Sequence, residues 1–100
     1  MKKIITLLFI ALVSTSITFT QNNSTKKADK LFDRLEYVKA AKEYLKLADK
    51  NPDNYIIERL ADSYYNMFNT REAEKWYSKI INDEPDAEVI FRYSEMLKAN

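Results

Sequence analysis

Apolar residues recur at spacings of three and four along most of the chain after residue 21, and polar or charged residues occupy the positions between them. This period is typical of helices that bury one face. It predicts five helices, at about residues 24–34, 37–50, 54–67, 70–82 and 87–98, and no strand. The chain is therefore expected to be all-α.

Prolines and short polar residues divide these helices. Pro52 and Pro85 each follow a helix, because proline disfavours the helical conformation in the residue before it. Asp53 is placed to cap the helix that follows Pro52. Asn69 and Glu72 resemble a capping box, in which each side chain accepts a hydrogen bond from an otherwise unpaired backbone N–H.

The middle of the chain, from position 37 to position 85, repeats itself. A small residue, an aromatic residue and a proline each return at one constant spacing, as Ala40 and Ala73, Tyr44 and Tyr77, and Pro52 and Pro85. A fixed period of about 33 residues is typical of helix-turn-helix solenoids, in which one unit cannot bury its apolar face alone. The function of such a protein is expected on a surface rather than in a catalytic pocket.

The second unit carries more of a known pattern. Leucine, a small residue and tyrosine on its first helix are followed by alanine, an aromatic residue and a closing proline: Leu60, Ala61, Tyr64, Ala73, Tyr77 and Pro85. This unit resembles the tetratricopeptide repeat, and the first unit resembles it less because it has Lys27 in place of Leu60. The resemblance implies a helix-turn-helix solenoid of about two and a half repeats and five antiparallel helices. Its units would span about residues 21–53, 54–86 and 87–100.

The tetratricopeptide pattern favours glycine in the turn between the two helices of a unit, but this chain contains no glycine. Leu35 and Phe68 occupy the corresponding turns. A bulky residue that adopts a positive φ there is strained, because its Cβ atom crowds the backbone.

The N-terminal segment, residues 1–20, predicts a secretory signal peptide. Lys2 and Lys3 precede an apolar run at residues 4–13, and small and polar residues follow it. A permanent transmembrane helix needs about 20 apolar residues, so the run is short for one, and an uncleaved inner-membrane anchor is the alternative. Small residues permit cleavage after Thr20 or after Ser16. The protein is thus expected to be exported, to the periplasm or to an outer-membrane-associated location.

The composition limits the chemistry of the chain. It has no cysteine and no histidine, which removes disulfides, thiolate metal sites, lipidated cysteines and the commonest general base. Without Lys2 and Lys3, 14 basic residues stand against 15 acidic ones, so no basic excess recruits nucleic acid. Asp29 and Asp33 lie one helical turn apart, but the sequence places no third oxygen ligand with them. We therefore expect no catalytic residue, metal or cofactor, and any envelope attachment through regions outside this chain.

The resemblance also implies a concave groove, lined by residues on the first helix of each unit that point away from its own second helix. These are Asp29, Phe32 and Asp33 in the first unit, Glu58, Asp62, Tyr65 and Asn66 in the second, and Phe91, Glu95 and Lys98 in the third. Carboxylates interleaved with aromatic rings suit a basic or amphipathic peptide of a protein partner. The alternative is that they are ordinary solvated side chains.

The last predicted helix has no second helix after it in the sequence. Ile90, Tyr93 and Leu97 form one apolar stripe on it, which we expect to stay uncovered. A signal peptide followed by this repeat resembles the start of larger bacterial envelope proteins, in which such an array precedes a β-propeller and an OmpA-like domain. An exported interaction scaffold of this kind is the favoured function. The alternatives are the non-catalytic arm of a secreted enzyme and a short, self-contained periplasmic adaptor.

Overall fold

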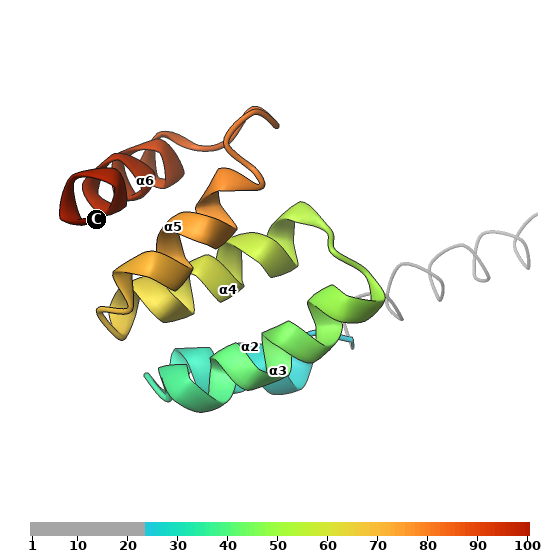
Figure 1. The fold of residues 1–100 in the computed structure, drawn as a ribbon. Coiled ribbons are helices and arrows are strands. Elements are labelled where there is room, and N and C mark those ends of the chain that lie inside the picture. Colours follow the sequence, from blue (N-terminus) through green and yellow to red (C-terminus); the bar gives the residue numbers. More distant parts are fainter. Residues whose placement is uncertain (1–23) are drawn as a thin grey trace, which may run out of the picture.

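The computed structural model describes residues 24–100, which are helical and contain no strand. Their helices are α2 (Lys26–Asp33), α3 (Tyr37–Lys50), α4 (Asn54–Asn66), α5 (Thr70–Ser78) and α6 (Ala87–Ala99) (Figure 1). The five predicted helices and the all-α fold class are thus confirmed. The predicted signal peptide lies outside the described residues.

Two helices are capped at their N-termini by the side chains predicted to cap them. The Asp53 carboxylate accepts a hydrogen bond from the Ile56 backbone N–H at 2.9 Å, and Asn69 accepts one from the Glu72 N–H at 3.4 Å. Glu72 does not complete a capping box. Its carboxylate instead accepts a hydrogen bond from the indole N–H of Trp76 at 3.2 Å.

Helix α5 is shorter than predicted, since it ends at Ser78 and not near residue 82. The chain continues in tight turns, in which the Ile80 N–H bonds the Tyr77 carbonyl and the Asp83 N–H bonds the Ile80 carbonyl. Each of these bonds reaches back one position less than an α-helical bond, as is common where a helix ends. Ile80 is nevertheless buried, as its spacing predicted, because the turns keep it directed at the core.

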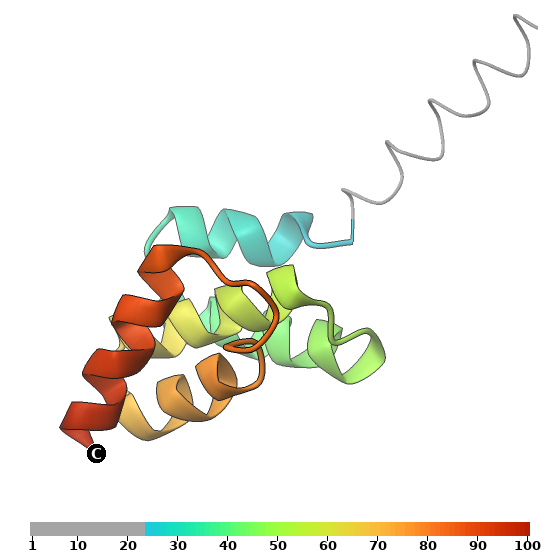
Figure 2. The same ribbon diagram turned by 90° about the horizontal axis from the view of Figure 1, so that it is seen from above.

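The helices stack in sequence order, and each packs against the next. Figure 1 shows α4 and α5 between the α2–α3 pair and α6, and the view in Figure 2 also places α4 between α2 and α5. Two apolar clusters join the units. The first contains Ala28, Ala40, Ala41, Tyr44, Ala48, Ile56 and Leu60, and the second contains Ile57, Ala61, Ala73, Tyr77, Ile80, Val89 and Met96. Because α4 contributes to both clusters, it is the central helix of the solenoid.

Helix α6 is the last helix in residues 24–100, and within these residues part of its apolar stripe is uncovered. Ile90 and Leu97 are each 51% exposed, as expected for a first helix without a partner. Tyr93 was expected to be uncovered as well, but it is partly buried and packs against the second cluster.

Both turns inside the units contain a residue with left-handed backbone. Leu35 has φ of 62° and Phe68 has φ of 59°, at the two positions where glycine was missing from the repeat pattern. Both side chains also face solvent, Leu35 at 69% and Phe68 at 89% exposure. The conformational strain at these turns is therefore not offset by packing of the side chain.

Replacing Phe68 with glycine should stabilise the protein, by about 1 kcal/mol, because glycine adopts this conformation without the Cβ clash. Phe68→Ala is the matched control, since it removes the ring but keeps the Cβ atom. The free energy of unfolding, measured by urea denaturation, should rise for the glycine variant and change little for the alanine variant. Equal effects of the two substitutions would contradict the role assigned to strain.

Candidate functional site

Two of the predicted groove carboxylates are hydrogen-bonded inside the fold. The Tyr44 hydroxyl donates to Asp29, and the Tyr77 hydroxyl donates to Asp62 at 2.5 Å. The two pairs are related by one repeat period, and the partners in each lie the same distance apart in the sequence. Each bond joins the first helix of a unit to its second helix. The same contact is thus made in both complete units.

An arginine on the first helix of the following unit also contacts the aspartate of such a pair. Arg92 of α6 donates to the Asp62 carboxylate at 2.8 Å, and its guanidinium lies 5.2 Å from the centre of the Tyr65 ring. Arg59, one repeat earlier, lies 4.4 Å from the centre of the Phe32 ring. Arginine is attracted to the faces of aromatic rings, so the stacking of successive first helices is stabilised in the same way twice.

The tyrosines in these pairs are held neutral. Burial raises the pKa of the Tyr77 hydroxyl far above its usual range, and the adjacent Asp62 charge raises it further. Burial and the bond to Asp29 do the same for the pKa of Tyr44. A hydroxyl that keeps its proton remains a hydrogen-bond donor at every physiological pH. These two hydroxyl groups therefore act as hydrogen-bond donors between the helices of each unit.

Glu95 occupies the third position in this series, one repeat after Asp62. Its carboxylate accepts a hydrogen bond from the Tyr65 hydroxyl at 2.6 Å, which joins α6 to α4. This bond is the leading cause of the raised pKa of Tyr65, with burial second. About half of the predicted groove residues thus make contacts between helices of the solenoid, namely Asp29, Phe32, Asp62, Tyr65 and Glu95.

These contacts were not predicted, although the sequence carries a signal for them. Aspartates at positions 29 and 62 share the period of Tyr44 and Tyr77. A carboxylate that recurs in step with a core tyrosine is a candidate partner for its hydroxyl, since buried hydroxyl groups are nearly always hydrogen-bonded.

The other predicted groove residues are differently placed. Asp33, Phe91 and Lys98 are exposed, and the exposed Asn66 side chain donates to the Asp62 backbone carbonyl at 2.8 Å within its own helix. Glu58 is half-buried and lines a pocket. The predicted groove residues therefore differ in their exposure and in their contacts.

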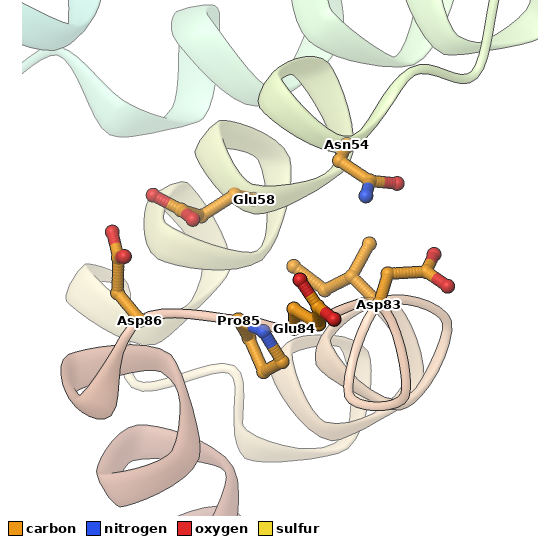
Figure 3. Close-up of a pocket in the computed structure, with 7 residues that line it drawn as sticks. Asn54, Glu58, Asp83, Glu84, Pro85 and Asp86 are labelled. Carbon is orange, nitrogen blue, oxygen red and sulfur yellow. The ribbon is translucent and has the colours of Figure 1, made fainter.

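The pocket at Glu58 lies between the start of α4 and the loop that precedes α6. Its volume is about 180 Å³, and it is lined by Asn54, Glu58, Ile80, Asp83, Glu84, Pro85 and Asp86. Figure 3 shows the side chains of Asn54 and Glu58 on α4, and the acidic side chains of the loop on the opposite side of the pocket. Glu58 and Asp86 lie at one end, and Asn54 and Asp83 lie at the other. Only Glu58 of this set was predicted as a site residue.

Four of the residues that line this pocket are acidic, and none is a lysine or an arginine. Within residues 24–100, none of the four carboxylates of the pocket forms an ion pair with a lysine or arginine. Burial raises the pKa of Glu58, and the charges of Asp62 and Asp86 raise it further, while Arg59 and Arg92 lower it less. An additional positive charge in the pocket would relieve this repulsion.

The part of the chain that the structure describes offers no metal centre. No group of three or more acidic side chains within residues 24–100 is arranged to hold a metal ion. In the same residues no helix has the length and apolar character required to cross a bilayer.

Comparisons with models of protein families, with curated proteins and with solved structures found no match for this chain.

Proposed function

We propose that this protein is an exported interaction module of the bacterial cell envelope, built on tetratricopeptide-like repeats, which binds a basic segment of a protein partner. In this proposal it forms the N-terminal part of a larger, OmpA-like, outer-membrane-associated protein. Export is supported by the apolar run at residues 4–13 after Lys2 and Lys3. The scaffold role is supported by the solenoid, whose apolar side chains pack its helices against one another.

The observation that carries the binding proposal is the acidic pocket at Glu58. Four carboxylates line it, one from α4 and three from residues 83–86. A lysine or arginine side chain of a partner would supply the positive charge that the pocket lacks. Charge complementarity of this kind gives specificity and fast association more than high affinity. The expected interaction is therefore weak to moderate and sensitive to salt.

A fluorescently labelled lysine-containing peptide should bind the protein and lose affinity when the pocket loses charge. Glu58→Gln and Asp86→Asn should each weaken binding by about two- to fivefold, which corresponds to about 0.5–1 kcal/mol for a partly exposed ion pair. Asp49→Asn is the matched control, because Asp49 is an exposed carboxylate on α3 outside the pocket. Fluorescence anisotropy at low and high salt measures these differences.

The pH dependence of the same titration gives an independent check. The pKa of Glu58 is raised, so this side chain becomes charged only at a higher pH than an ordinary glutamate. Affinity for the peptide should consequently increase as the pH rises through that raised pKa, and the increase should be smaller for Glu58→Gln. If Asp49→Asn weakens binding as much as the pocket variants do, peptide attraction is non-specific and the proposal is wrong.

A further inference from the structure

The connections between the helices lie on two opposite sides of the solenoid. The turn edge, formed by the turns inside the units (residues 34–36 and 67–69), lies at the left in both Figure 1 and Figure 2. The loop edge, formed by the connections between units (residues 51–53 and 79–86), lies at the right in both views. Each edge therefore brings together segments that are one repeat apart in the sequence.

The turn edge exposes large apolar side chains at its tips. Leu35 and Phe68 are 69% and 89% exposed, and Val38, in the first turn of α3, is 59% exposed. Arg34 and Asn69, which flank the tips in the sequence, are exposed as well. Each turn thus presents an apolar tip beside polar neighbours.

The exposure of these tips does not depend on which unit follows. The second unit packs beside the first, with α4 against α3, and Leu35 still faces solvent. Phe68 holds the same position one repeat later. A further unit stacked beyond α6 would leave Phe68 exposed in the same way.

Both tips have a backbone conformation that is costly for their residue type. The positive φ angles of Leu35 and Phe68 would be adopted with less strain by glycine or asparagine. Glu84 also has a positive φ, but it lies on the loop edge and its side chain is charged. Strained residues of this kind are concentrated where a protein binds or switches. Strain and exposure together indicate that the apolar side chains at the tips serve a contact outside the solenoid.

The charges of the two edges indicate what the tips contact. The loop edge carries four acidic residues and one basic residue: Asp53, Asp83, Glu84, Asp86 and Lys79. The turn edge has no such excess, because residues 33–39 and 66–72 contain equal numbers of acidic and basic residues. Arg34 and Arg71 are exposed there, and neither forms an ion pair within residues 24–100. A surface that is both apolar and anionic would therefore attract the turn edge and repel the loop edge.

We infer that the turn edge binds the surface of an anionic phospholipid bilayer. Leu35 and Phe68 enter the boundary between headgroups and acyl chains, and Arg34 and Arg71 contact the lipid phosphates. Separate protruding side chains can each enter a bilayer, whereas a protein partner requires a surface of matching shape. The acidic pocket at Glu58 lies on the loop edge and faces away from the membrane. Loss of basic-peptide binding at the pocket would therefore leave this inference intact, and the reverse also holds.

The local environment of single positions tests the orientation on the membrane. The chain has no cysteine, so one introduced cysteine can carry the fluorophore nitrobenzoxadiazole. Because the apolar run at residues 4–13 can bind lipid by itself, the amount of full-length protein bound is not the readout. With vesicles of phosphatidylethanolamine and phosphatidylglycerol, emission from a label at Leu35→Cys should increase and shift to shorter wavelength. A label at Asn82→Cys, exposed on the loop edge, should not change.

Matched substitutions in the Leu35→Cys protein separate the apolar contact from the charge. Phe68→Asn should remove most of the shift and keep the fold, because asparagine tolerates left-handed backbone. Phe91→Gln, which removes an exposed ring from the half of α6 nearer the loop edge, should leave the shift unchanged. Replacing Arg34 and Arg71 with glutamine should reduce the shift on these vesicles but not on vesicles of phosphatidylcholine alone.

The opposite results are equally clear. Unchanged emission from position 35, or an equal change at position 82, would overturn the inference. So would a shift that needs no lipid and grows with protein concentration, because the tips would then contact a second copy of the chain. Circular dichroism of each variant verifies that its helices are intact.

Discussion

Tyr77→Ala is expected to lower the free energy of unfolding by about 3–5 kcal/mol, the range found when a large buried aromatic side chain is truncated. The Tyr77 ring has no exposed surface and lies in the cluster that joins α4, α5 and α6. Its removal leaves a cavity that rigid neighbouring helices cannot close. The hydroxyl bond to Asp62 is lost at the same time. Urea denaturation followed by circular dichroism measures the change.

Tyr77→Phe separates the two parts of this effect. The phenylalanine ring fills the same space, so only the hydrogen bond to Asp62 is removed. This variant should lose about 1–2 kcal/mol, the range for a bond to a charged group. If Tyr77→Ala is no more destabilising than Tyr77→Phe, the tyrosine is not packed in the core as described.

Asp62→Ala should destabilise the protein by about 3 kcal/mol, as expected when one member of a buried, hydrogen-bonded charged pair is deleted. Asp62 is 6% exposed, and its carboxylate accepts bonds from both Tyr77 and Arg92. Without it, the buried Tyr77 hydroxyl loses its partner, and the partly buried Arg92 guanidinium keeps only its bond to Glu88. Asp62→Asn should be less damaging, because its amide oxygen still accepts a hydrogen bond.

A double-mutant cycle tests whether this energy comes from the bond to Tyr77. The changes Asp62→Ala and Tyr77→Phe act on the same interaction, so the double variant should be more stable than the sum of the single losses predicts. Asp62→Ala with Phe68→Gly is the control combination, because Phe68 is exposed and shares no partner with Asp62. Additive losses in the Asp62 and Tyr77 pair would show that the hydroxyl is satisfied in some other way.

The helices themselves were predictable from local physics. Spacing of three and four indicates which residues share a buried face, and a polar side chain after a proline marks a helix start. Asp53 illustrates this, because it caps α4 as predicted. The end of α5 was not predictable in the same way. The apolar spacing continues to Ile81, and only packing in three dimensions shows that the residues after Ser78 reach the core through turns.

The candidate site was predicted only in part. A helical period shows on which side of its helix a residue lies, but it does not show which other segment packs against that side. Glu58 was predicted from its position on a first helix. Its companions in residues 83–86 could not be, because a loop has no period that would place its side chains against α4.

By itself, the sequence determined the repeat period, the all-α class and the identity of the buried tyrosines, since each of these follows from spacing along one chain. Only the tertiary structure decided the role of the carboxylates. Asp62 and Glu58 have similar chemistry and lie one turn apart on α4, yet Asp62 is bonded to Tyr77 and Arg92 whereas Glu58 lines an unneutralised pocket. The physical reason is that a carboxylate is stabilised by whichever groups approach it from other helices, and those helices are distant in sequence.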